Sequence, residues 1–176
     1  MRIHVLRREQ HLEGSPEEVF PFFADPRNLV VITPPLLRFR VVTPDPIEMR
    51  VGTFIQYRLR LHGVPVRWDT AIQDWSPPHR FVDVQVRGPY ALWHHTHEFA
   101  PMTGSHPRGT VMTDTVRYAI GFGPLGELAR RALVRRDLDA IFDFRARRVP
   151  QLLALGGRGD QRQPVEDQVD AGQVAR

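Results

Sequence analysis

Hydrophobic and polar residues alternate along several short segments of the chain, which is the pattern of strands that bury one face. In residues 53–61, for example, the apolar side holds Ile55, Tyr57, Leu59 and Leu61, and the other side is polar. The segments that predict strands are residues 2–12, 36–42, 53–61, 64–75, 80–87, 91–100 and 110–120. Short turn signals separate most of them, so we expect neighbouring strands to pair as an antiparallel meander.

Two kinds of signal predict helices. The motif Ser15-Pro16-Glu17-Glu18 is a capping box with proline at the first helical position, so a short helix should begin there. Asp25-Pro26 ends it, and a second short helix is expected over residues 26–31. The longest helical pattern comes last, where apolar residues recur at i, i+3, i+4 and i+7 between Leu125 and Val149.

This order of elements predicts an α+β fold. An open antiparallel sheet with one apolar face needs a cover, and the long C-terminal helix is available for it. We therefore predict a helix-grip fold, a curved antiparallel sheet of about six to seven strands wrapped around that helix, with two short helices after the first strand. The domain should span residues 1–155, and the polar residues 156–176 should form a disordered tail.

Composition and charge favour a single soluble domain. The chain has 176 residues, of which 41% are hydrophobic, and its formal net charge is only +4. Nucleic-acid binding would require a concentrated basic patch, so we expect no nucleic-acid partner. The segment after Met1 has no apolar run typical of a signal peptide, and no apolar stretch is long enough to cross a bilayer. We expect a cytoplasmic protein without stable membrane insertion.

The residue types that are missing exclude several chemistries. The chain contains neither Cys nor Lys, which excludes thiolate nucleophiles, Cys-ligated zinc and Schiff-base lysines. None of Ser15, Ser76 and Ser105 lies in the strand-turn-helix elbow of a serine hydrolase. The side chains left for function are those of His, Asp, Glu, Tyr and Arg, which suit ligand binding and acid–base chemistry.

The segment from Gly88 to Phe99 carries the most informative pattern. Read as a strand, it places Trp93, His95, His97 and Phe99 on one face. A face that only packs against the core would normally carry Val, Ile or Leu. Two imidazoles between aromatic rings therefore indicate the inner wall of a pocket.

With these motifs in place, the chain resembles the SRPBCC (START-like, birch-pollen-allergen-like) superfamily over about residues 2–153. Within it, the resemblance is strongest to the bacterial polyketide cyclase/dehydrase and lipid-transport group. The motifs that carry it are Phe22-Phe23-Ala24-Asp25-Pro26 with Asn28-Leu29, Pro65-Val66-Arg67-Trp68, Gly88-Pro89-Tyr90, Thr113-Asp114-Thr115-Val116-Arg117-Tyr118 and Ile141-Phe142-Asp143-Phe144-Arg145. The resemblance implies a deep hydrophobic pocket but no single activity, because some relatives cyclise polyketides and others only carry ligands.

The two histidines have two chemical interpretations. Asp114 shares a face with Tyr118 on the next strand, where it can lie beside His95 or His97. Two His and one carboxylate form a facial metal triad in some enzymes. A hydrogen-bonded network explains the same residues more simply, so we predict no metal and no cofactor.

Three further features are ambiguous in sequence. Arg145 falls within the apolar stripe of the last helix, where it either extends to the surface or pairs internally with Asp83 or Asp114, the pair being favoured. Residues 80–87 have Phe81 on one side and valines on the other, so their inward face stays open. The match Gly121-Phe122-Gly123-Pro124-Leu125-Gly126 lacks the following strand of a dinucleotide site.

These observations favour a non-enzymatic protein that binds a hydrophobic or amphipathic small molecule, such as a lipid or polyketide, between sheet and helix. The predicted ligand-binding residues are Tyr57, Trp68, Trp93, His95, His97, Phe99, Asp114, Tyr118, Phe142 and Arg145. The first alternative is a polyketide cyclase or dehydratase, with His95, His97 and Asp114 as catalytic candidates. The second is an interaction module with a filled cavity. The protein is expected to be a monomer or homodimer.

Overall fold

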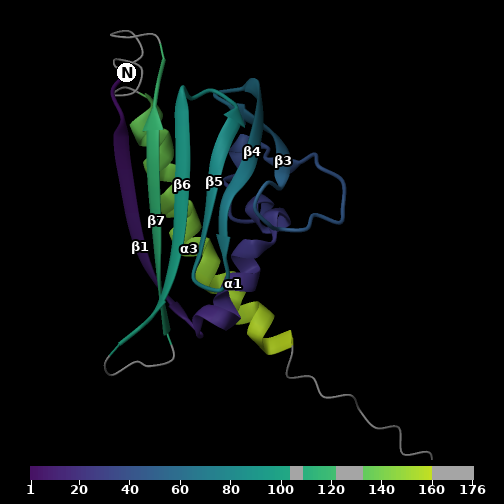
Figure 1. Ribbon diagram of the computed structural model, residues 1–176, viewed down its shortest axis with the longest axis vertical. Helices are drawn as coiled ribbons and strands as arrows, with labels where there is room; N and C mark the ends of the chain where they lie inside the picture. Colours follow the sequence, from purple (N-terminus) through teal and green to yellow (C-terminus); the bar gives the residue numbers. More distant parts are fainter. Residues whose placement is uncertain (104–108, 122–132, 160–176) are drawn as a thin grey trace, which may run out of the picture.

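The computed structural model describes residues 1–103, 109–121 and 133–159. One antiparallel sheet of seven strands, in the order β1-β7-β6-β5-β4-β3-β2, is packed against the long helix α3 (Figure 1). The predicted α+β helix-grip fold is confirmed. The strands are β1 (His4–Glu13), β2 (Arg40–Val41), β3 (Phe54–Leu61), β4 (Val64–Ser76), β5 (Arg80–Arg87), β6 (Leu92–Pro101) and β7 (Gly109–Ala119). The helices are α1 (Pro16–Ala24), the 3-10 turns η1 (Pro26–Val30) and η2 (Pro35–Leu37), and α3 (Arg135–Gly159).

The β3–β4 hairpin shows how local sequence sets the strand register. His62 and Gly63 have φ angles of 50° and 83°, the left-handed values that a tight two-residue hairpin turn needs. The turn pairs Leu61 with Val64, and the remaining pairs follow from it. Two register shifts later in β4 interrupt its ladder with β5. Such irregularities increase strand twist, which helps the sheet to curve around α3.

Helix α3 lies along one face of the sheet, behind β6 and β7 in the view of Figure 1. Leu138, Phe142 and Val149 are buried on its inner stripe. The helix is also held to the edge strand β1, where Gln10 donates a hydrogen bond to the carbonyl of Ala146 at 2.8 Å. Hydrophobic burial and edge contacts therefore position the same helix.

Helix α1 closes one end of the sheet with a dry aromatic core. Its first turn is stabilised by Glu18, whose carboxylate accepts a hydrogen bond from the Ser15 amide at 2.7 Å. Phe20 then packs against the rings of Trp75, Phe81 and Phe99 at centroid distances of 5.3, 5.9 and 5.3 Å. This end of the fold leaves no room for a ligand beside Phe20.

One prediction about the elements was wrong, and another falls partly outside the described residues. Residues 36–42 were expected to form a strand, but they contain the end of η2 and only the two-residue strand β2. Arg38 has a φ angle of 44°, which is incompatible with a continuous strand. The last helix was expected from Leu125, and its first part, with most of the glycine motif at 121–126, lies outside the described residues.

Helix α3 continues to Gly159, and the rest of the expected tail, residues 160–176, lies outside the described part of the chain. Among the described residues, no helix has the length and apolar character needed to cross a membrane.

The aromatic core predicts that replacing two different phenylalanines with alanine will have very different effects on protein stability. Phe20 is only 4% exposed, so Phe20→Ala should lower the free energy of unfolding by about 3–5 kcal/mol. Phe54 is 44% exposed, and Phe54→Ala should change it by less than about 0.5 kcal/mol. Urea denaturation of both variants measures the difference, and similar losses would contradict this description of the core.

Candidate functional site

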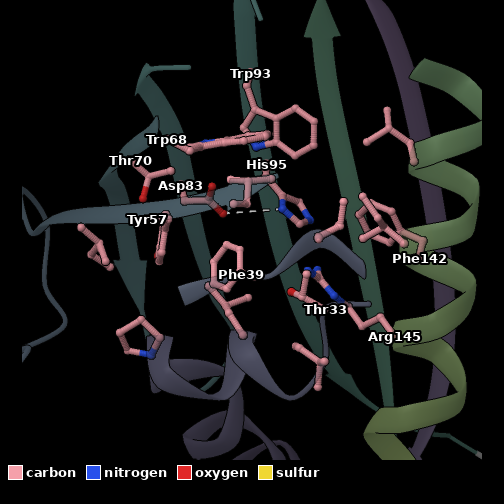
Figure 2. Close-up of a pocket in the computed structure, with 18 of the residues that line it drawn as sticks. Thr33, Phe39, Tyr57, Trp68, Thr70, Asp83, Trp93, His95, Phe142 and Arg145 are labelled. Carbon is pink, nitrogen blue, oxygen red and sulfur yellow. Dashed lines mark ion pairs between the residues drawn. The ribbon is translucent and has the colours of Figure 1, made fainter. Parts of the chain in front are cut away.

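A cavity of about 300 Å³ lies between the curved sheet, helix α3 and the segment that contains η1 and η2 (Figure 2). Of the residues predicted to bind a ligand, those that line it are Tyr57, Trp68, Trp93, His95, His97, Phe142 and Arg145. The wall residues outside that prediction include Phe22, Phe23, Leu29, Ile32, Thr33, Phe39, Met49, Ile55, Leu59, Thr70, Phe81, Asp83, Tyr90 and Leu138. Most of these side chains are aliphatic or aromatic, as in binding sites for apolar ligands.

Three predicted wall residues lie elsewhere. Phe99 is on the expected face of β6 but is covered by α1 through contacts with Phe20 and Phe23. Tyr118 packs against the rings of His4 on the edge strand β1 and of Tyr90 at the cavity wall, and does not itself line the cavity. Asp114 lies behind the two imidazoles and reaches the cavity only through them. The strand alternation was correct for all three, but alternation does not tell which part of a face stays uncovered.

Three adjacent strands bring the polar residues of the cavity together. Strand β6 supplies His95 and His97, and its neighbours supply one carboxylate each. Asp83 of β5 lies directly opposite His95, and Asp114 of β7 lies directly opposite His97. Directly opposed residues on one face of an antiparallel pair have neighbouring side chains. The register of the sheet therefore places two imidazoles between two carboxylates.

Distances within this cluster are short on both sides of the rings. The Nε2 atom of His95 is 2.9 Å from Oδ1 of Asp114, and Nδ1 of His97 is 2.7 Å from the same oxygen. Toward the cavity, Oδ2 of Asp83 is 3.1 Å from Nε2 of His97 and 3.6 Å from Nδ1 of His95. The two ring centroids are 3.8 Å apart. Each imidazole therefore has a carboxylate at both of its nitrogens.

Burial and pairing act in opposite directions on the two carboxylates. Burial by itself raises the pKa of Asp114, but hydrogen bonds and charge from the two imidazoles outweigh it and hold that pKa far below its ordinary value. The pKa of Asp83 is also lowered, because contacts with the imidazoles and the charge of Arg145 outweigh the effect of burial. Both carboxylates are therefore ionised at neutral pH.

The pKa values of the two histidines are shifted in opposite directions. Burial, and then the charge of His97, lowers the pKa of His95, and these effects exceed the opposing influence of the carboxylates. For His97, burial acts downward, but hydrogen bonds to Asp114 and Asp83 outweigh it and raise the pKa. A proton added to the pair of rings is therefore held by His97 in preference to His95.

Aromatic rings enclose this cluster. Phe81 stacks on His97 at 4.1 Å between centroids, and Phe142 of α3 meets the edge of His95 at 5.7 Å. Above His95 in Figure 2, Trp68 and Trp93 form an edge-to-face pair, with their ring centroids 5.0 Å apart. The cavity therefore joins a flat apolar region to one charged wall.

Arg145 projects from α3 toward the cavity (Figure 2). The internal ion pair expected with Asp83 or Asp114 is absent from the described residues, because both carboxylates are taken by the imidazoles. Its guanidinium carbon instead lies 5.1 Å from the Phe142 ring centroid, and its buried Nε has no hydrogen-bond partner among the described residues. Arg145 can therefore donate to an acceptor group inside the cavity.

Asp83 is the functional candidate that the sequence reasoning did not select. The alternation of residues 80–87 did not decide which face of this strand points inward. In the structure, Phe81 and Asp83 line the cavity and Val86 is 61% exposed. With Asp83 in place, one donor atom each from Asp83, His95 and His97 lies within 4.8 Å of the others, which is compatible with holding a metal ion. The signal in the sequence was an acidic residue two positions after an inward-facing aromatic.

The pKa shifts predict how stability depends on pH in chelator-treated protein. The lowered pKa of Asp114 means that its contribution is complete above about pH 4 and is lost as the pH falls toward the folded value. The raised pKa of His97 means that its contribution is complete below about pH 6.5 and is lost as the pH rises through the folded value. The lowered pKa of His95 acts the other way, since its contribution is complete above about pH 6.5 and is lost as the pH falls through the folded value. The two histidines therefore oppose each other around pH 6.5, and the net loss of stability is expected at acid pH, as Asp114 is protonated.

Asp114→Asn should remove the pH-dependent contributions of Asp114 and His97. It should lower the free energy of unfolding by up to about 3–5 kcal/mol and flatten its dependence on pH. Asp139 pairs with Arg8 at the surface, so Asp139→Asn should cost less than about 1 kcal/mol. Urea denaturation across the pH range measures both variants. A wild-type pH profile in Asp114→Asn would contradict the proposed charge states.

Known proteins with this fold include enzymes and proteins described only by their superfamily. The chain is similar to the Zhui aromatase/cyclase from Streptomyces sp. R1128, with a TM-score of 0.71, 12% identity and coverage of 91% of this chain and 99% of that one. It is similar to a START superfamily protein from Mycobacterium smegmatis, with a TM-score of 0.60, 14% identity and coverage of 85% and 99%. A norcoclaurine synthase from Thalictrum flavum gives a TM-score of 0.64 at 12% identity, with coverage of 89% and 97%. At these identities the likeness shows the fold alone.

No curated protein matches the chain in sequence. A family model does match, and it extends from β1 to the last turns of α3, over residues 4–154. The match therefore includes every strand of the sheet and the cavity between sheet and helix. The chain belongs to the polyketide cyclase / dehydrase and lipid transport family.

Proposed function

We propose that this protein binds a hydrophobic or amphipathic small molecule in the cavity between the sheet and α3. The observation that carries the proposal is a cavity of about 300 Å³ with mostly apolar walls inside a folded core. This volume is at the lower end of the range for small-molecule sites, about 300–1,000 Å³, so a compact ligand is favoured. A cavity of this size also argues against an interaction module whose interior is filled by side chains.

The arrangement of the walls suggests how the ligand is oriented. Its flat apolar part packs beside Trp68 and Trp93, which form one end of the cavity. A hydrogen-bond acceptor or acidic group points toward Arg145, whose Nε has no partner within the described chain. A compact aromatic or polycyclic molecule with one acidic or carbonyl group fits both regions.

A second candidate function is a cyclase or dehydratase of the polyketide type. One observation favours it, namely that paired imidazoles and a carboxylate face the cavity. In this function a histidine removes a proton next to a carbonyl group, and Arg145 stabilises the enolate. Tyr118, the other group considered for the enolate, does not line the cavity. Conversion of a poly-β-ketone by the wild type and not by His95→Ala would distinguish catalysis from binding.

The proposed binding site predicts that Trp93→Ala weakens binding of the neutral hydrophobic dye Nile red by about tenfold, because it removes a large aromatic contact. Trp75 is a matched control, since it packs against Phe20 and does not line the cavity. Trp75→Ala should reduce stability and leave dye affinity unchanged. Fluorescence titration below both melting transitions measures the affinities, and equal affinity in Trp93→Ala would contradict the site.

The proposed role of Arg145 predicts charge selectivity. Arg145→Leu should weaken binding of the anionic dye 8-anilino-1-naphthalenesulfonate by about tenfold and change Nile red binding much less. Arg136 is exposed on the same helix and serves as the control, because Arg136→Leu removes the same charge at a position that lines neither this cavity nor the groove beside Arg147. Equal losses for both dyes in Arg145→Leu would indicate a packing role only.

A further inference from the structure

The cluster on the cavity wall contains more N···O contacts than hydrogen bonds. The two imidazoles make N···O contacts of 2.9 and 3.6 Å for His95, and of 2.7 and 3.1 Å for His97. A neutral imidazole has one N–H and one lone pair. Two of these contacts are hydrogen bonds, between Nε2 of His95 and Asp114 and between Nε2 of His97 and Asp83, and two neutral rings can donate both. The other two bring a ring nitrogen close to a carboxylate oxygen without a hydrogen bond, and Nδ1 of His97 is buried with no hydrogen-bond partner among the described residues. A cation next to these carboxylates would therefore be stabilised.

The geometry favours one place for such a cation. Asp83, His95 and His97 each direct one donor atom to a common region, and these atoms lie within 4.8 Å of one another. All three residues line the cavity, so the remaining coordination positions would be open to a ligand. Two histidines and one carboxylate with open positions are a known set for iron(II) and related ions.

The carboxylate behind the rings completes the arrangement. Oδ1 of Asp114 contacts the nitrogen of each ring that is turned away from Asp83. In metal sites, a ligating histidine almost always donates its other N–H to such an acceptor, which fixes the ring and its tautomer. Asp114 is 7% exposed, makes this hydrogen bond with His95 and lies 2.7 Å from Nδ1 of His97.

We propose that Asp83, His95 and His97 bind a divalent transition-metal ion, with Asp114 positioning the two imidazoles. This differs from the metal-free network expected from sequence, in which Asp114 was the only carboxylate considered as a ligand. Imidazole donors favour cobalt, nickel, copper, zinc or iron over magnesium and calcium, which prefer oxygen ligands. Arg145 also reaches this wall, and its charge opposes weakly held cations. The proposal does not depend on the identity of the organic ligand.

The test uses the untagged full chain after dialysis against a chelator. Titration with Co²⁺ should produce visible absorption bands of an imidazole-ligated ion, saturating at one ion per chain by native mass spectrometry. Asp114→Asn should weaken Co²⁺ binding by about 10–100-fold, the usual effect of losing such a supporting group. Asp83→Asn, which removes a ligand, should weaken it at least as much.

His94 provides the matched control, because it lies between the two ligands in sequence but alternates to the other face of β6. His94→Ala should keep wild-type Co²⁺ affinity. Circular dichroism checks the fold of each variant. The melting temperature of the wild type gives a second measurement, since it should rise with Co²⁺ and return with chelator. No saturable Co²⁺ binding by the wild type, unchanged affinity in folded Asp83→Asn, or an equal loss in His94→Ala would overturn the proposal.

Discussion

The burial of two imidazoles between two carboxylates is the constraint on which the site depends. Asp114 contacts one nitrogen of each ring from β7, and Asp83 contacts the other from β5. Charged groups with low exposure are tolerated only when each has a partner, so these contacts keep the three strands in one register. They also fix the ring orientation, which determines what an occupant of the cavity meets on that wall.

The rest of the fold divides the concave face of the sheet into two regions. At one end, α1 brings Phe20 against Phe81 and Phe99, and the space is filled. Farther along, Leu138 and Phe142 of α3 face the sheet across the cavity. The strands β5 and β6 belong to both regions, because Phe81 packs in the dry core and also stacks on His97. One region is therefore a filled aromatic core, and the other contains the cavity.

Membership of the polyketide cyclase / dehydrase and lipid transport family is consistent with either carriage or catalysis. The composition of this chain limits the chemical groups that its cavity can offer. Without Cys or Lys, the cavity offers imidazole, carboxylate, phenol, indole and guanidinium groups. Burial raises the pKa of Tyr57, so this wall phenol stays neutral at physiological pH. Among the described wall residues, Asp25 and Asp137 already pair with Arg27 and His62, which leaves Arg145 and the Asp83–histidine cluster as the charged groups most available to an occupant.

The sequence by itself determined the elements and the faces of most strands. A period of two residues is a local property of an extended chain, so the shared face of His95 and His97 could be predicted without knowing their neighbours. The capping box at Ser15 and the turn at His62-Gly63 are local for the same reason. Only the tertiary structure decided which side chains contact one another in the site. Asp83 reaches the histidines because β5 pairs with β6 in one register, and Arg145 lacks its expected partner because the imidazoles already occupy both carboxylates. These outcomes depend on which strands pair and which face stays uncovered, and both are long-range consequences of packing that no local pattern encodes.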